Sequence, residues 1–214
     1  MKERIEPLWH MELAVLALIG LQILLGDRFS PGPKYFIVVL ECLQLIVLIL
    51  IRNSGHPEKE RWHWRMMLLL TAFVSAVNTS SLLLVMRALV AHPAGLSGQT
   101  LILSALATYA TNVIVFGLWY WQLDGGGPGG RGSHQPPIDF LFTQMVTDST
   151  ITKEPGWRPA FFDYLYLSIT NATAFSPTDV LPLTHRAKLL MSIQSFTAFA
   201  TVAVVAARAI NILA

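Results

Sequence analysis

The sequence predicts an all-α integral membrane protein with five transmembrane helices plus one short re-entrant helix. Hydrophobic residues make up 53% of the 214 residues and charged residues only 13%, which is typical of chains whose helices lie in a bilayer. A helix needs about 20 apolar residues to cross the hydrocarbon core. Five stretches approach or exceed that length: Leu8–Leu25, Tyr35–Ile51, Met66–Val90, Leu101–Trp121 and Ala187–Leu213. A sixth, Phe161–Thr173, is too short to cross and predicts the re-entrant segment.

The same composition argues against several other classes of protein. The net charge is only +2 and the basic residues form no patch, so nucleic acid is not expected as a partner. The only cysteine, Cys42, lies in an apolar run and leaves no disulfide framework or cysteine-ligated metal site within one chain. The sequence has no metalloprotease, nucleophile-elbow or nucleotide-binding motif. We therefore expect no enzyme, no metal and no cofactor.

Three regions follow one another along the chain. Residues 1–122 form a four-helix transmembrane region, which begins with a retained anchor because no signal-cleavage site follows the first span. Within it, residues 52–65 are predicted to be a polar connection. Residues 123–158 form a loop rich in glycine and proline, whose apolar piece Ile138–Val146 either lies on the bilayer surface or packs against the pore mouth. Residues 159–214 hold the pore-like hairpin and the last transmembrane helix.

The hairpin prediction depends on the residues that come after the short apolar run. Asn171–Asp179 is polar and irregular, and such backbone is tolerated at membrane depth only where protein surrounds it or it lines a water-filled cavity. One set of residues here resembles the pore helix, filter and outer mouth of the potassium channel superfamily, namely Tyr164, Ser168, Thr170, Thr173, Asp179, Pro182 and Thr184.

The centre of this pattern departs from that superfamily. Potassium filters read TVGYG, whereas Thr173–Thr178 contains no glycine and includes Pro177, which fixes φ. A ring of backbone carbonyls selective for potassium is therefore not predicted. A second resemblance covers more of the chain and is to a family of bacterial integral membrane proteins with a degenerate channel-like hairpin. The similar residues are Leu123–Gly126, Phe162–Tyr166, Ser176, Asp179 and the helix from Ser195 to Asn211.

Together the resemblances imply that the re-entrant segment is a pore helix with a filter-like loop. They also imply a homotetrameric, cation-channel-like protein of the plasma membrane that passes an ion or a small solute. The candidate filter residues are Thr170, Asn171, Thr173, Ala174, Phe175, Ser176, Pro177, Thr178 and Asp179. A ring of Asp179 carboxylates would favour cations, although Asp179 and Thr178 are also suited to capping a turn or the last helix. The alternative function is a non-conducting scaffold or sensor in which the hairpin is a plug.

A polar stripe on the last predicted span offers candidate pore-lining residues. Its members fall within an arc of about 100° on a helix and are Gln194, Thr197, Thr201, Arg208 and Asn211. They would line the path behind the filter, but hydrogen bonding between helices within one chain explains such a stripe equally well.

Two charged residues lie within predicted spans. Glu41 in the second span and Arg87 in the third are expected near the same membrane face, and they predict an intramembrane ion pair. The alternatives are an Arg87 side chain that reaches the headgroups and a protonated Glu41 between helices. A transporter or membrane enzyme that uses this pair is a third functional class.

The charge distribution leaves the orientation open. An N-terminus inside the cell places eleven of the fifteen Lys and Arg residues on the cytoplasmic side, as the positive-inside rule favours. It also places the hairpin on that side, whereas potassium channels insert theirs from outside. Either the hairpin is inverted, or Phe161–Pro182 crosses the membrane, or the charges of the long loop mislead the rule.

Overall fold

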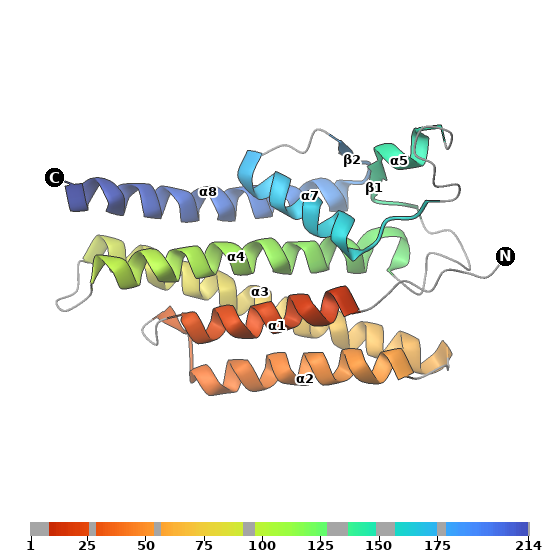
Figure 1. Cartoon of the computed structure of the whole chain (residues 1–214), viewed down its shortest axis with the longest axis horizontal. Helices are drawn as coiled ribbons and strands as arrows, with labels where there is room; N and C mark the ends of the chain where they lie inside the picture. The colour runs from red at the N-terminus through yellow and green to blue at the C-terminus, as the bar shows by residue number, and fades with distance from the viewer. Residues whose placement is uncertain are drawn as a thin grey trace.

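The structure is a computed structural model that describes residues 9–25, 29–53, 57–91, 97–127, 137–148, 157–174 and 179–213. Its long helices run along one axis (Figure 1) and are α1 (Trp9–Leu24), α2 (Lys34–Asn53), α3 (Pro57–Ala91), α4 (Gly98–Leu123) and α8 (His185–Leu213). The shorter elements are η2 (Asp124–Gly126), β1 (Phe140–Phe142), α5 (Thr143–Val146), α7 (Phe161–Ala174) and β2 (Val180–Pro182). Apart from one small ribbon, the described residues confirm the predicted all-α class.

Among the residues that the structure describes, three helical stretches are long and apolar enough to cross a membrane, namely Trp64–Ala88, Gly98–Gly126 and His185–Ala207. Trp9–Leu24 and Tyr35–Val47 are apolar helices of shorter length. These lengths indicate a membrane protein. Each of the five apolar stretches predicted to span overlaps one of the long helices.

The connection between the second and third apolar stretches corrects the sequence prediction. Residues 52–65 were expected to be a polar connection, yet α2 continues to Asn53 and α3 already begins at Pro57. Proline is well suited to the first position of a helix, where its missing N–H is not needed. The Glu, Lys and Arg residues that follow it are good helix formers, so residues 57–65 are polar but helical.

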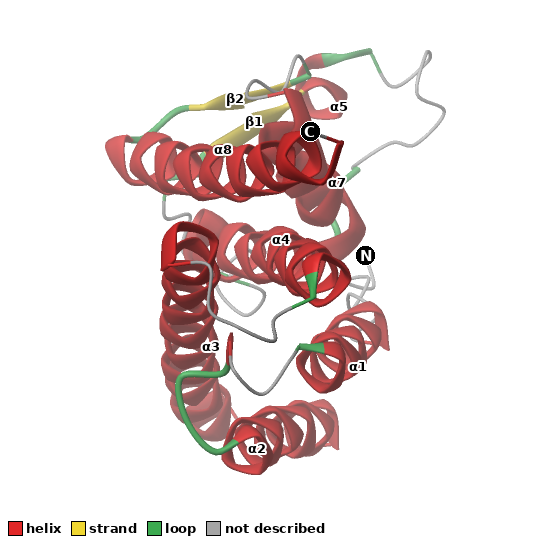
Figure 2. Ribbon diagram, turned by 90° about the vertical axis from the view of Figure 1, so that its left-hand side faces the viewer, coloured by secondary structure: helices red, strands yellow, loops and turns green. Residues whose placement is uncertain are grey.

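Helix α4 lies in the middle of the bundle (Figure 2). Helices α1, α2 and α3 lie on one side of it, and α7 and α8 lie on the other. Most of the buried side chains of α4 face these neighbours, including the polar residues Ser104, Thr108, Thr111, Asn112 and Gln122. Each polar group that this buried helix places inside needs a hydrogen-bond partner.

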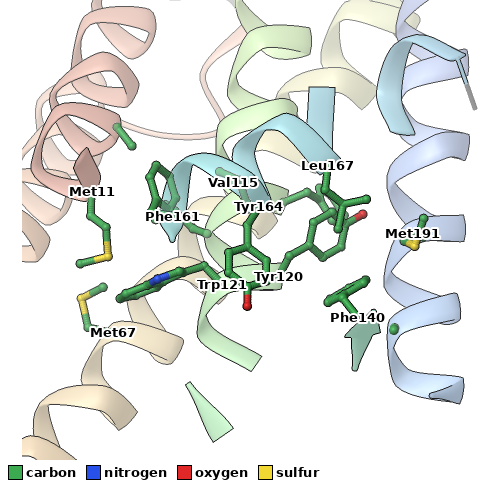
Figure 3. Packing of buried hydrophobic residues seen from close by; sticks show 14 of the residues in the cluster. Met11, Met67, Val115, Tyr120, Trp121, Phe140, Phe161, Tyr164, Leu167 and Met191 are labelled. Atoms are coloured by element: carbon green, nitrogen blue, oxygen red, sulfur yellow. The ribbon is translucent and has the colours of Figure 1, made fainter. Parts of the chain in front are cut away.

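Aromatic rings fill the space between α4, α7 and β1 (Figure 3). Tyr164 and Phe140 pack edge to face with a centroid distance of 6.4 Å, and Tyr120 packs against Phe140 at 5.1 Å. On the other side of α7, Phe161 meets Trp121 edge to face at 6.3 Å. These five residues are at most 2% exposed. Buried ring pairs of this kind contribute about 0.5–1.5 kcal/mol each beyond their area, so they help to hold α7 against α4.

Strands β1 and β2 form an antiparallel ribbon in which Phe140 pairs with Pro182, Leu141 with Leu181 and Phe142 with Val180. Phe140 and Phe142 are buried and Val180 is 2% exposed, so one face of the ribbon packs onto the bundle. Part of the stretch Ile138–Val146 therefore packs against the bundle, whereas the predicted contact with a pore mouth stays a prediction.

The chain turns back within the length of the bundle after α7. Helix α7 begins beside the C-terminal end of α4, runs inward, and β2 lies at the same end from which α7 started (Figure 1). We call the path from α7 to β2, residues 161–182, the α7–β2 segment. Helix α8 then starts at that end and runs the length of the bundle.

Candidate functional site

The buried face of α7 is joined to α4 and α8 by side-chain hydrogen bonds. Gln194 Oε1 accepts from the Tyr120 hydroxyl at 2.5 Å and from Asn171 Nδ2 at 2.8 Å. Gln194 Nε2 donates to Ser168 Oγ at 2.6 Å. These four side chains are at most 2% exposed. Because water cannot replace a lost partner there, such a network fixes one arrangement of the helices.

Helix α7 approaches α4 closely at one glycine. A Cβ atom on Gly117 would lie 3.2 Å from the Cα atom of Leu165, which is tight against backbone. One turn later on α7 and one turn earlier on α4, the Ser168 hydroxyl donates to the carbonyl oxygen of Val113 at 2.6 Å. Small residues allow this contact between membrane helices. Val113 is ten residues before the end of α4 at Leu123, so Ser168, in the middle of α7, lies about 15 Å along α4 at helical rise.

At the end of the bundle where α7 begins, one carboxylate joins α4, α7 and β1. Asp124 is 1% exposed, and its Oδ2 atom accepts from the Tyr164 hydroxyl at 2.5 Å. Its Oδ1 atom accepts from the backbone N–H groups of Asp139 at 2.6 Å and Phe140 at 3.2 Å. Hydrogen bonds to an ionised group are among the stronger ones in proteins, so Asp124 fixes where α7 begins.

The glycines after Asp124 are required by the turn that places it. Gly125, Gly126 and Gly127 have φ values of 58°, 79° and 81°, a region that residues with a Cβ atom rarely adopt. At Gly127 a Cβ atom would also lie 2.6 Å from Trp64 Nε1. The start of the glycine-rich loop is therefore a specific turn.

A second carboxylate joins β1 to the start of α8. Asp139 accepts from the Thr184 hydroxyl and forms an ion pair with Arg186, whose Nη2 atom also donates to the Leu123 carbonyl oxygen at 3.1 Å. The Asp139 side chain is 2% exposed and that of Arg186 is 53% exposed. The backbone carbonyl of Asp139 accepts from Leu183 N–H at 2.8 Å. This cluster holds β1 against the residues that follow β2 and begin α8.

The candidate filter residues have different environments. Asn171 is buried in the network described above, whereas the Thr170 and Thr173 hydroxyls donate to carbonyl oxygens of their own helix. Thr173 is exposed on the surface of the chain. Ala174 ends α7. Four candidates lie outside the described residues: Phe175, Ser176, Pro177 and Thr178.

Asp179 lies where the described chain resumes. Its Oδ1 atom is buried and has no hydrogen-bond partner among the described residues, while its carbonyl oxygen accepts from Thr143 N–H at 3.3 Å. The residue that caps α8 is Thr184, whose hydroxyl oxygen accepts from Ala187 N–H at 3.1 Å. Asp179 therefore does not cap this helix.

Of the described residues of the polar stripe of α8, Gln194 and Thr201 are buried and Thr197 is half-buried. Gln194 and Thr201 are 0% and 1% exposed. Thr201 donates to the Thr197 carbonyl oxygen at 2.8 Å, and Thr197 donates to that of Ile193. The side chains of Arg208 and Asn211 lie outside the described part of the chain. Gln194 forms hydrogen bonds to α4 and α7 of its own chain, as expected for the alternative in which the stripe joins helices and does not line a path.

Glu41 and Arg87 are not brought together. Gln44 Nε2 reaches Thr71 Oγ1 at 3.5 Å, which sets the register of α2 against α3 and places Glu41, one turn earlier, near the level of Val74. Arg87 is thirteen residues beyond Val74, about 20 Å along the helix. Glu41 is buried, whereas Arg87 is exposed. The prediction assumed a longer connection, and the early start of α3 moves Arg87 past the beginning of α2.

The most heavily bonded carboxylates of this region were not predicted as site residues. Asp124 appears in the sequence only as part of a resemblance, and Asp139 lies in a segment with no pattern of its own. Both act on residues 15 or more positions away. A weak signal exists in the run of glycines after Asp124, which indicates a turn that needs positive φ.

The described residues contain no group of three or more His, Cys, Asp or Glu that could hold a metal ion. What the arrangement offers is a short helix fixed on its buried face by a polar network and at its start by the carboxylate of Asp124, while Asp139 holds β1 to the start of α8 beside it. Comparison with family models, curated proteins and solved structures gives no match to the chain.

Proposed function

We propose that the chain is one subunit of a homotetrameric, channel-like protein with five transmembrane helices, in which re-entrant α7–β2 segments of neighbouring copies surround a path for ions or small solutes. The proposal depends on one observation: α7 has 14 residues, about 21 Å at helical rise, which is too short to cross a bilayer, and the chain has returned to its starting end at β2. A helix that enters a bilayer only part of the way leaves a turn at depth, and such a turn needs protein or water around it.

The outer face of α7 supports the same proposal. Phe162, Tyr166 and Ile169 are 65%, 47% and 43% exposed, and Thr173 is exposed near the inner end. A face that the chain itself leaves uncovered can meet another copy, and cyclic symmetry would bring equivalent faces around one axis. The rigid attachment of the inner face to α4 and α8 would keep such a path open.

Asp179 is the residue on which we base selectivity. Its buried Oδ1 atom has no hydrogen-bond partner among the described residues. Asp179 is also the last residue of the candidate filter. A ring of such carboxylates favours cations. Since the candidate filter has no glycine, we expect passage without preference for potassium over sodium.

The test is flux through liposomes that contain the purified protein. We expect cation flux above that of protein-free liposomes, similar rates for potassium and sodium, and a several-fold decrease in Asp179→Asn. Glu12→Gln is the matched control, because it also converts a carboxylate to an amide but lies in the first turn of α1, and it should keep the wild-type rate. Wild-type flux equal to that of protein-free liposomes would contradict conduction.

One observation favours the alternative of a non-conducting scaffold or sensor. The exposed face of α8 is apolar: Leu189, Ile193, Phe196, Phe199 and Val202 are between 48% and 77% exposed, while Gln194 is used within the chain. An apolar α8 face is suited to contact with lipid or a partner helix. In that case the liposomes would show no flux although the protein is folded in detergent, whether it is a monomer or an oligomer.

A further inference from the structure

A carboxyl group lies buried in the apolar part of α2, away from the α7–β2 segment. Glu41 is 1% exposed and belongs to Tyr35–Val47, one of the apolar helical stretches. Its Oε2 atom is buried and has no hydrogen-bond partner among the described residues. An isolated carboxylate in such surroundings is costly, because nothing replaces its water or balances its charge.

A second orphan acceptor lies one turn further along the same helix. Gln44 is 0% exposed, its Nε2 atom is directed to Thr71 Oγ1 at 3.5 Å, and its Oε1 atom has no partner among the described residues. Side chains three positions apart on a helix are neighbours, with about 5–6 Å between their Cβ atoms. Two acceptors cannot pair with each other, but one proton placed between them satisfies both.

Within the described part of the chain, the helices packed around Glu41 bring no basic side chain to its level. Helix α1 carries His10 and Glu12 in its first turns, beside the far half of the antiparallel α2. On α3 the described basic side chains nearest in sequence to Val74 are Arg65 and Arg87, nine and thirteen residues away. On α2 itself the titratable residues are Lys34 and Tyr35 at the start, the exposed Cys42, and Arg52 near the end.

We propose that Glu41 is a proton-binding site within the bilayer: its carboxyl group carries a proton and donates a hydrogen bond to Gln44 Oε1. A hydrophobic carbodiimide is the chemical probe for such an acid. The carboxyl oxygen adds to the central carbon of the carbodiimide while the carboxyl proton moves to one of its nitrogens. Migration of the acyl group to nitrogen then leaves a stable N-acylurea with no leaving group.

The experiment uses the full chain in liposomes, treated with dicyclohexylcarbodiimide and analysed by peptide mass spectrometry. We expect one modified peptide, containing Glu41, with labelling that decreases as the pH is raised. The modification should be lost in Glu41→Gln and retained in Glu12→Gln. A water-soluble carbodiimide should leave Glu41 unmodified, because the site lies in the apolar part of the chain.

A measurement on the unaltered protein guards against a variant that fails to fold. Infrared difference spectra should contain the C=O band of a protonated carboxylic acid, which should shift in Gln44→Leu and disappear in Glu41→Gln. Absence of both the band and the labelling in the wild-type chain would overturn the proposal. Labelling that sodium blocks equally at every pH would also overturn it, since the site would then hold a metal cation.

Discussion

At the scale of single residues, Gln194 shows how a membrane-embedded amide can specify packing. Its oxygen accepts from α4 and α7 while its nitrogen donates to α7, so both ends of the amide are used. The sequence predicts that this side of α8 is polar, but not whether it faces a path or a neighbouring helix. It faces neighbouring helices because its partners are Tyr120 and Asn171, which lie 74 and 23 positions away along the chain.

The network makes a prediction for Gln194→Leu. The Tyr120 hydroxyl would lose its acceptor at 2.5 Å, and a buried donor without a partner costs about 1–3 kcal/mol. We expect the free energy of unfolding in detergent to fall by that amount. Gln99→Leu makes the same chemical change at an exposed position of α4 and should stay within about 0.5 kcal/mol of the wild type. Equal stability of the two variants would show that the network does not stabilise the fold.

At the scale of elements, apolar runs predict the long helices well, because burial or lipid contact demands an uninterrupted apolar stretch. The start of α3 was missed because its first residues are polar, although they are good helix formers. The β1–β2 ribbon was missed for another reason. Its strands have three residues each and are separated by residues 143–179, so neither strand length nor a tight turn marks the pairing in the sequence.

The ribbon depends on Asp139, which leads to a prediction for Asp139→Asn. The substitution removes the charge that Arg186 meets and one acceptor that the amide cannot replace. Because Arg186 is half exposed, we expect a local loss of only about 1 kcal/mol. Hydrogen exchange should become faster at Leu183, whose N–H donates to Asp139, and should be unchanged in the middle of α3. Unchanged exchange at Leu183 would mean that the strand pairing alone holds this end.

At the scale of the whole molecule, the two halves of the bundle have separate polar centres on either side of α4. Thr71, Gln44 and Gln122 gather between α2, α3 and α4, and the Gln194 network gathers between α4, α7 and α8. The proposed proton site and the proposed path therefore belong to different halves of the chain. Loss of one function by mutation should leave the other measurable.

The assembly itself is the last prediction. If α7 of neighbouring copies surround one axis, Thr173 near the inner end of that helix should lie close to its equivalents. In a Cys42→Ala background, Thr173→Cys should be linked between chains by a flexible bismaleimide, and native mass spectrometry in detergent should give four copies. Leu69→Cys is the control, because Leu69 is 65% exposed but lies on α3, across α4 from α7. A single copy without cross-links would exclude a path between subunits, since one α7–β2 segment cannot enclose a path alone.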